Sequence, residues 1–470
     1  MEKYKIKIEN LFLILCLLWG FLFIVINPPF QASDEDSHLY KIYGFTQGSW
    51  TFKKLSLNGI DSQNPTKKIT ISGQYLPAGL VKSSRLNKRI ITHPEQKTSI
   101  KESFDIISTP LFKEYPVFIS YSVPSYTPVA YIPAVFIIWL LSLINSPPAI
   151  MLYVGRLCCL LTYILLTFFA IKITPKGKWI LFSVALLPMM IYRAGALSID
   201  ALTCGCAFLL TAYALNLIYN DDIAQISKKH NLIFMLLSTI LVFCKFTYLP
   251  LILLYFLIPD KKFKNKKQKI YTSLVFLFTT FAITFLQVLI TAITSAGLSA
   301  NSMASSYLVL HPISFFKIIL NTLYTNANEY ITGFVGLFGW SDTYLPKIFV
   351  FCYIFLICMF SCIKSDNKIS INKNERIFFL TICLVSFIAM YAVFSIIFQV
   401  DTKTGTLIGL QGRYLIPLAP LFFLALSNPF IEKHETLYKF TGIFLINLIL
   451  AISTFTIITH QNCKKFDCIR

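Results

Sequence analysis

The sequence predicts an all-α polytopic membrane protein, and its composition and its apolar runs support this fold class. Hydrophobic residues make up 56% of the 470 residues and charged residues only 14%, which is more apolar surface than one soluble core can bury. Apolar runs that approach the roughly 30 Å of bilayer hydrocarbon recur along the chain. We therefore expect about 11 transmembrane helices in a single integral membrane domain, residues 1–470, with further re-entrant or juxtamembrane helices.

The predicted spans follow one another with short polar connections. Several are shorter than about 18 residues, so we expect tilted or broken helices. The first run ends at Pro28-Pro29, which stops a helix, and it has no small-residue cleavage site, so it is interpreted as a retained helix. The runs are Leu11–Ile26, Ala149–Ile171, Trp179–Tyr192, Leu197–Ile218, Leu232–Cys244, Leu249–Ile258, Tyr271–Ile293, Ile348–Ile363, Ile377–Phe398, Tyr414–Leu426 and Phe440–Thr459.

The position of the charges predicts the orientation of the chain. A net charge of +20 in a soluble protein would favour nucleic acid as a partner, but here the lysines cluster between apolar runs, so membrane lipid is the expected partner and nucleic acid is not. Lys3, Lys5 and Lys7 precede the first span and place the N-terminus in the cytoplasm, together with the cluster at 261–269. Asp34, Asp200, Asp342 and the segment from Asp401 to Arg413 are then outside, as is the C-terminus.

A polar first external loop, residues 31–126, is expected to form a compact extracytoplasmic subdomain on the helices. It carries turn signals such as Asn58-Gly59, and the alternation from Ile69 to Tyr75 indicates a strand. The apolar segment 127–144 that follows contains Pro128 and Pro133, which favour a juxtamembrane or re-entrant helix. If this segment crossed fully, every later segment would invert.

Two further external regions are predicted. Residues 295–346 contain Phe338-Gly339-Trp340-Ser341-Asp342 and are expected to be irregular, which indicates a cavity because such backbone must be covered by protein or water. Cys463 and Cys468 flank a polar tail on the same side. A disulfide and two free thiols are both open for them.

An acidic cluster, Asp34-Glu35-Asp36 followed by His38, stands immediately after the first span. Carboxylates crowded there repel one another unless a metal, a base or a proton offsets them. They offer a general base and, in Asp34, Glu35 and Asp36, hard ligands for a divalent cation such as Mg²⁺ or Mn²⁺. The alternative is a solvated loop that neutralises nearby lysines. Tyr40 follows at helical spacing, and function is favoured.

Asp200 lies beside an apolar run, where a carboxylate must be paired or solvated. Arg193 is seven residues earlier, so a continuous helix would pair the two. Gly195 weakens that helix, and a turn that delivers Asp200 to the outer cavity is the other interpretation. Both remain open.

Cations at the edges of spans are candidate phosphate ligands. Lys245 interrupts two hydrophobic runs and either snorkels or contacts a phosphate. Arg413, between Gln411 and Tyr414, suits bidentate phosphate recognition, and interfacial anchoring is the alternative. Arg156 has the same two interpretations, with anchoring favoured. The chain contains no phosphate-cradling Gly-rich loop followed by Lys-Ser or Lys-Thr and no His-Glu-x-x-His, so ATP-driven or zinc-hydrolytic chemistry has no support.

These motifs, taken together and in order, resemble the bacterial membrane-protein family called domain of unknown function 2142. Each motif alone is weak, but the ordered set extends over almost the whole chain. The matching residues are Pro28-Pro29-Phe30, Asp34-Glu35, His38-Leu39-Tyr40, Ser198-Ile199-Asp200-Ala201-Leu202, Lys245-Phe246-Thr247-Tyr248-Leu249-Pro250, Phe338-Gly339-Trp340, and Gln411-Gly412-Arg413-Tyr414 with Pro417.

That family is similar to the C-type glycosyltransferases, which use polyprenyl-phosphate sugars. The resemblance implies a catalytic base or metal site at Asp34 and Glu35 and a helper acid at Asp200. His38, Tyr40, Lys245, Trp340, Asp342, Gln411, Arg413 and Tyr414 are then expected to bind substrate. Asp36 stands where the family often has a small residue or proline, so which carboxylate is the base stays open.

The favoured hypothesis is an inverting glycosyltransferase of the bacterial cytoplasmic membrane with an extracytoplasmic site. It would transfer a sugar from a polyprenyl-phosphate donor to a cell-envelope glycan or lipid acceptor. A transporter or flippase of a lipid-linked saccharide is the alternative, and it would need polar groups near the bilayer midplane. A non-catalytic component of a polysaccharide assembly complex is the third possibility.

Overall fold

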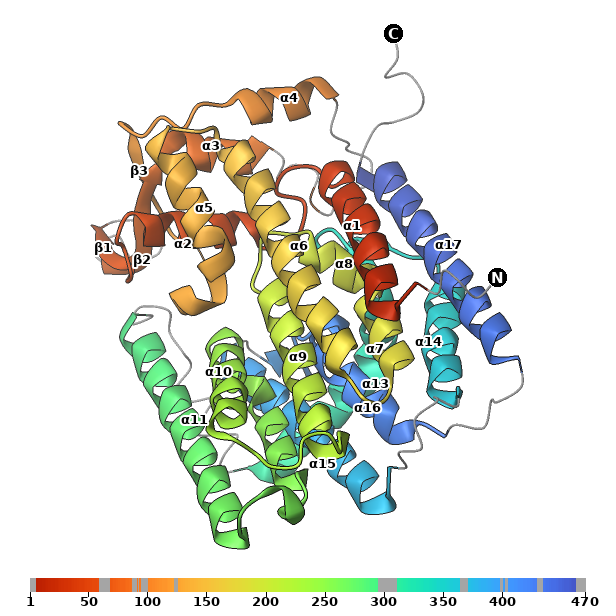
Figure 1. The fold of residues 1–470 in the computed structure, drawn as a ribbon. Helices are drawn as coiled ribbons and strands as arrows, with labels where there is room; N and C mark the ends of the chain where they lie inside the picture. Colours follow the sequence, from red (N-terminus) through yellow and green to blue (C-terminus); the bar gives the residue numbers. More distant parts are fainter. Residues whose placement is uncertain are drawn as a thin grey trace.

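The computed structural model is mostly helical, as the sequence predicts (Figure 1). It describes residues 6–58, 68–86, 91, 93, 100–121, 126–294, 311–363, 371–397, 400–401, 405–428 and 434–461. Within these ranges six helices are long and apolar enough to cross a membrane. They are α1 (Ile8–Ile26), α6 (Pro148–Ile173), α9 (Asp200–Tyr219), α11 (Lys266–Thr294), α15 (Lys373–Ile397) and α17 (Glu435–Gln461).

Shorter helices lie where four of the other five spans are predicted, and the count of about 11 spans stays a prediction. They are α10 (Lys228–Cys244), η3 (Phe246–Leu257), α14 (Lys347–Cys362), and η5 (Gly412–Leu418) continued by α16 (Ala419–Leu426). The run Trp179–Tyr192 is not one helix but two, α7 (Lys178–Ala185) and α8 (Pro188–Ala194). Pro188 has no N–H to continue the preceding helix and instead opens the next one.

The segment 127–144 forms a short 3₁₀ turn, η2 (Pro128–Tyr131), followed by α5 (Ile132–Leu143). The 12 residues of α5 rise about 18 Å, which is less than the hydrocarbon thickness of a bilayer. Pro147-Pro148 then opens α6, which packs along α5. The segment is one of the shorter apolar helices of the chain, as η3 is, and the juxtamembrane or re-entrant interpretation stays a prediction.

The region 295–346 differs from the expectation of irregular structure. Residues 295–310 lie outside the described part of the chain, but Pro312–Val335 form a regular helix, α13. Its asparagines and Glu329 lower the hydropathy of the run without breaking its helical period. From residue 312 to residue 346, the irregular part is the hairpin of β4 (Leu337–Phe338) and β5 (Thr343–Tyr344), where Gly339 and Ser341 have positive φ.

The loop subdomain contains a three-stranded antiparallel sheet and short helices. The strands β1 (Lys53–Asn58), β2 (Lys68–Pro77) and β3 (Pro116–Ile119) pair in the order β1-β2-β3, with Lys53 opposite Gly73 and Gln74 opposite Ile119. The predicted strand at Ile69–Tyr75 is confirmed within β2. In Figure 1 these strands lie with α2 (Glu35–Thr46), α3 (Ala78–Leu86) and α4 (Ile100–Ser108) at one end of the helical bundle.

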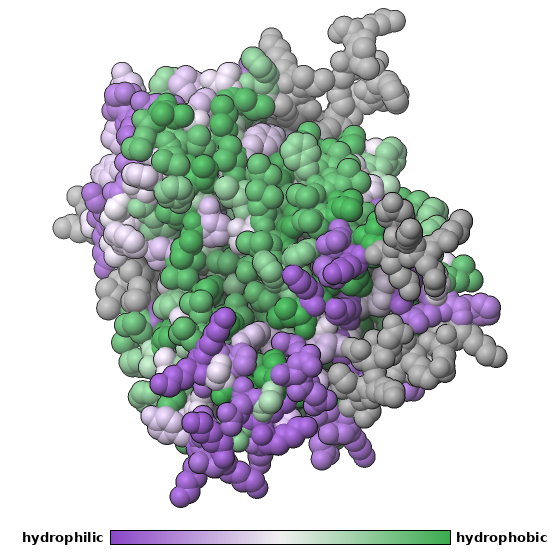
Figure 2. Space-filling view, in the orientation of Figure 1, coloured by the Kyte–Doolittle hydropathy of each residue, from purple (hydrophilic) through white to green (hydrophobic). Residues whose placement is uncertain are grey.

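The core of the bundle is built by α1, α6 and α9, with α6 packed against both of the others. Small residues permit the close approach: a Cβ at Gly20 on α1 would meet the Leu160 side chain of α6. Large apolar side chains remain exposed on the outer faces of α1, α11 and α17. Figure 2 shows a broad hydrophobic surface above a hydrophilic lower end, near the lower ends of α10 and α11 in Figure 1. This distribution fits a bilayer-embedded protein.

The remaining elements are small. η4 (Asp260–Lys262) precedes α11, and its Lys262 ammonium donates to the carbonyls of Leu217 and Asn220 at the end of α9. β6 (Val400–Asp401) and β7 (Thr406–Leu407) form a second short hairpin. The two cysteines of the predicted C-terminal tail, Cys463 and Cys468, lie outside the described residues.

Candidate functional site

The chain turns sharply between α1 and α2, and this corner presents Asp34. Pro28-Pro29 end α1, Phe30 has φ +64° and Asp34 has φ +67°. Left-handed backbone at residues with side chains costs of order 1–2 kcal/mol each, and such strain clusters at functional sites. The Asp34 carboxylate is partly exposed and makes no hydrogen bond or ion pair within the described part of the chain. It is therefore available as a base.

Glu35 points elsewhere. Its carboxylate is fully buried and accepts from Arg156 Nε at 2.8 Å and Nη2 at 2.6 Å, and from the Leu197 N–H at 3.0 Å. Arg156 is not an interfacial anchor, because its side chain is also fully buried. Asp36 also has local bonds, accepting from the Ser37 N–H at 2.7 Å. The three neighbouring acids thus face three different environments.

Asp200, the first residue of α9, combines the ion pair of one interpretation with the turn of the other, and the continuous helix is absent between Ala194 and Asp200. Arg193 Nε donates to its Oδ2 at 2.7 Å, so the ion pair is present. The turn around Gly195 separates α8 from α9 and also presents the same oxygen to Arg413, whose Nε lies 3.9 Å away. Asp200 is therefore the shared counter-ion of two arginines.

Arg413 enters the site from η5 and is only 8% exposed. Its Nη1 donates to Ser33 Oγ at 3.0 Å, next to the contacts of Arg193 with Ser33 O and Oγ, both at 3.3 Å. Among the described residues no group accepts a hydrogen bond from Arg413 Nε. A buried guanidinium N–H without an acceptor is costly, so this position suits an anionic ligand.

Lys245 joins the same group from the connection between α10 and η3. Its Nζ lies 3.3 Å from the centroid of the Tyr414 ring, a close cation–π contact. Burial lowers the pKa of Lys245 to about 7, although Asp200 partly offsets this. Tyr414 is held in place because its carbonyl accepts from Tyr248 Oη at 2.8 Å.

His38 packs against the rings of Tyr126 and Tyr131 beside the acids. Its Nδ1 is 2.7 Å from Tyr131 Oη, and its ring stacks on Tyr126 with centroids 6.2 Å apart. Burial lowers the pKa of His38 to about 4, so the ring is neutral at pH 7. The electrostatic neighbours of His38 are Asp34, Arg193, Asp200 and Arg413, which places all of them at one site.

The charges of this site do not balance. Two carboxylates, Asp34 and Asp200, face three cations, Arg193, Arg413 and Lys245. Whenever Lys245 is protonated, the site has a surplus of positive charge in partly desolvated surroundings. An anion is the group that relieves such a surplus.

The other predicted substrate-binding residues are distributed around this centre. Trp340 Nε1 donates to the Phe30 carbonyl at 3.4 Å, and the neighbouring Gly339 N–H donates to Tyr192 Oη at 3.0 Å. The Gln411 carbonyl accepts from the Tyr414 N–H at the start of η5. These contacts hold the corner at Phe30 and the segment that carries Arg413.

Two of the predicted substrate-binding residues, Tyr40 and Asp342, form hydrogen bonds with residues outside the charged site. Tyr40 hydrogen-bonds to Ser84 in the loop subdomain and packs on Tyr121. Asp342 accepts from Thr343 Oγ1 at 3.1 Å, and the same hydroxyl contacts His460 on α17.

Sequence reasoning missed Ser33, Tyr126 and Tyr131 as parts of the site, and it considered Arg193 only as a partner of Asp200. Arg193 had a detectable signal, since it is a charge in the four-residue break between two apolar runs. Ser33 and the tyrosines have no such signal, because their residue types are common in polar loops.

The fold and the site together define a class: a helical, multi-pass membrane protein with a buried charged site between its helices. The chain belongs to the family described as predicted membrane protein (DUF2142), whose model matches residues 17–422. The resemblance drawn from the sequence motifs is thereby confirmed. A search of curated proteins finds no match.

Proposed function

We propose that the protein is a membrane glycosyltransferase that uses a lipid-phosphate-linked sugar as donor. The observation that carries this proposal is the combination of an unbonded carboxylate, Asp34, with a surplus of cations at the buried Arg413 and the half-buried Lys245. A base and an anion site in one place are what transfer from a phosphate leaving group needs.

An apolar cavity beside the site supports a lipid donor. It has a volume of about 640 Å³ and lies between α13, α15 and η5, with Tyr330, Ile377, Leu384, Phe387, Leu415 and Leu418 among its lining residues. The same short element η5 directs Arg413 to the charged site and Leu415 and Leu418 to this cavity. An amphiphile with a phosphate head and an isoprenoid tail matches both parts.

In the proposed reaction, the Asp34 carboxylate removes the proton from an acceptor hydroxyl. The hydroxyl oxygen attacks the anomeric carbon, and the bond from that carbon to the phosphate oxygen breaks with its electron pair on the phosphate. The anomeric configuration inverts. Arg413 and Lys245 stabilise the negative charge that develops on the leaving phosphate.

Replacing Asp34 tests the base. Asp34→Asn should lower kcat by about 10²–10⁴-fold, the usual contribution of a general base, while donor affinity is kept. The matched control is Asp36→Asn, which removes the same charge two residues along the chain. The Asp36 carboxylate is bonded to Ser37, so this variant should retain activity. The measurement is transfer of labelled sugar by purified protein in proteoliposomes. Full activity of Asp34→Asn, or lipid translocation without covalent transfer, would contradict the proposal.

A divalent cation held by Asp34, Glu35 and Asp36 together does not fit this geometry. In the described part of the chain no three His, Cys, Asp or Glu side chains gather as a metal site, since Glu35 is bonded to Arg156. Transfer assayed in EDTA tests metal dependence. Unchanged activity is expected from a site whose arginines balance the phosphate; loss restored by Mg²⁺ or Mn²⁺ would show that a cation acts with the donor.

A further inference from the structure

The buried pair of Glu35 and Arg156 connects the two loops that carry the acids of the site. Arg156 on α6 donates to three carbonyls at the end of α1: Ile24 at 3.3 Å, Asn27 at 2.7 Å and Pro28 at 3.0 Å. Carbonyls at the end of a helix lack partners within it, and a cation there satisfies them. The corner that leads to Asp34 is thereby fixed to α6.

The other side of the pair holds the loop before Asp200. Glu35 Oε1, which already accepts from Arg156 Nε, also accepts from the Leu197 N–H at 3.0 Å. Leu197 lies in the turn between α8 and α9, three residues before Asp200. Glu35 directly follows Asp34, so one carboxylate is bonded to the loops of both acids.

We propose that Glu35 and Arg156 are positioning residues that fix Asp34 and Asp200 relative to each other. The expected effect on catalysis rests on the proposed function, whereas the fixed position of the two loops does not. Neither residue acts on the substrate: both carboxylate oxygens of Glu35 are already bonded, and protonating it would leave the Arg156 charge buried without a counter-ion.

Kinetics of Glu35→Gln distinguish positioning from catalysis. The variant should lower kcat by about 10–100-fold, as loss of an orienting contact does, and leave the donor KM within about twofold. The double variant E35Q/R156Q removes both buried charges and serves if the single variant does not fold. Asp34→Asn is the comparison, because it alters the base and leaves the pair intact.

Hydrogen exchange supplies a readout that does not depend on activity. Glu35→Gln should speed exchange of the amides at 195–199 and 30–35, whereas Asp34→Asn should leave 195–199 unchanged. This measurement stays valid if the wild-type protein transfers no sugar, so failure of the proposed function and failure of the positioning role are separable. A folded Glu35→Gln protein with wild-type kcat and exchange would overturn the positioning role. Activity as low as that of Asp34→Asn with unchanged exchange would instead make Glu35 the base.

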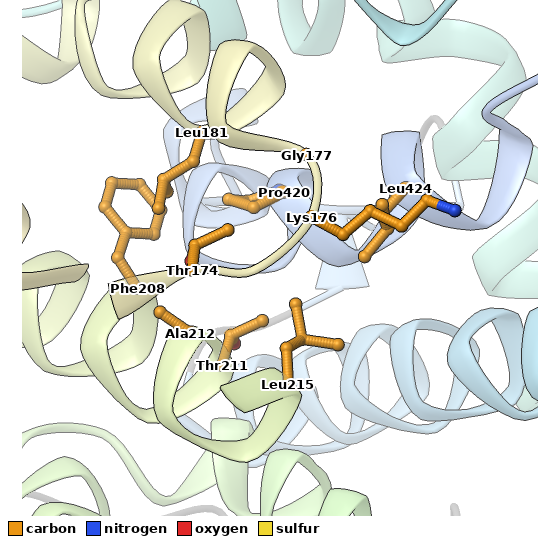
Figure 3. A pocket seen from close by; sticks show the side chains of 10 residues that line it. All are labelled: Thr174, Lys176, Gly177, Leu181, Phe208, Thr211, Ala212, Leu215, Pro420 and Leu424. Carbon is orange, nitrogen blue, oxygen red and sulfur yellow. The ribbon is translucent and has the colours of Figure 1, made fainter. Parts of the chain in front are cut away.

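A second observation comes from the opposite end of α6 and α9. A small cavity there, shown in Figure 3, is lined by Thr174, Lys176, Gly177, Leu181, Phe208, Thr211, Ala212, Leu215, Pro420 and Leu424. Thr174 and Thr211 are buried, and neither hydroxyl has a hydrogen-bond partner among the described residues. The room for the centre of a water-sized molecule is about 10 Å³, close to what one water requires.

We infer that this cavity binds a single water molecule that bridges Thr174 and Thr211 and so ties the end of α6 to α9. An experimental map at about 2 Å resolution should show one peak within hydrogen-bond distance of both Oγ1 atoms. Thr211→Val, which keeps the volume of the side chain and removes the hydroxyl, should remove the peak, whereas Thr211→Ser, which keeps the hydroxyl, should retain it. Absence of the peak in the wild-type protein, or its persistence in the valine variant, would overturn the inference.

Discussion

Lys245 is the residue of the site whose charge changes near neutral pH. Its pKa is lowered to about 7 by burial, so the ammonium is present below pH 7 and is lost as the pH rises through that value. A sugar phosphate diester keeps its negative charge throughout this range. Donor affinity should therefore fall between about pH 6 and pH 8, by the contribution of one cation.

The control for this pH dependence is Lys245→Arg, which keeps the charge at every pH in the range. Its donor Kd should be nearly flat between pH 6 and pH 8. Equal pH profiles for the two proteins would show that Lys245 does not bind the phosphate. His38 does not contribute to the profile, because its pKa of about 4 leaves it neutral throughout.

Among the individual residues, ion pairs between positions close in the sequence could be predicted, and ion pairs between distant positions could not. The Arg193–Asp200 bond joins residues only seven apart, although the turn at Gly195 interrupts the continuous helix that this spacing assumed. The Glu35–Arg156 bond joins residues 121 positions apart, and no local pattern encodes it. For this reason the sequence locates the acidic cluster but does not separate Asp34, which is available, from Glu35, which is bonded.

Among the elements, η5 depends on Gly412 for its position. A Cβ there would lie 1.9 Å from the Tyr330 carbonyl and 2.6 Å from the Phe334 nitrogen, both backbone atoms of α13 that cannot rotate away. Gly412→Ala should therefore shift η5, displace Arg413, and destabilise the protein by about 1–3 kcal/mol, as overpacking does.

The comparison variant is Gly20→Ala, where the new methyl group meets the flexible end of the Leu160 side chain. Thermal unfolding in detergent and donor binding should both be affected more by Gly412→Ala. If the two variants behaved alike, the close contact of η5 with α13 would not determine the site.

Element boundaries followed from the sequence where proline or period-2 alternation was strong. Pro28-Pro29 end α1 and the alternating run at Ile69–Tyr75 lies in β2. Hydropathy alone did not predict two regions correctly. The asparagines of α13 indicated a loop, although the helix is regular. The single apolar run that contains Pro188 forms two helices, α7 and α8. The helical period decides the first case and the missing N–H of Pro188 the second, and hydropathy records neither.

For the whole molecule, the distribution of lysines predicts which ends of the helices share a compartment. Cysteines introduced at position 34 and at the exposed position 408, five residues before the buried Arg413, should react with the same impermeant maleimide added outside cells. A cysteine at position 264 should react only after the membrane is opened. Labelling of 34 and 408 from opposite sides would contradict a shared extracytoplasmic site. Cys463 and Cys468, which are predicted on the external side, are replaced by serine in this experiment, and most of the described native cysteines are buried.

The full burial of the Glu35–Arg156 pair determines how this part of the protein responds to ionic strength. Salt screens charges that water can reach over about 8 Å at physiological concentration, but it does not enter a site from which solvent is excluded. Rising salt should thus weaken capture of a charged lipid at Arg413 and Lys245 long before it loosens the joint between α1, α6 and the Leu197 turn. Under the proposed function, high salt should therefore release the lipid phosphate while the joint between the two acid-bearing loops stays intact.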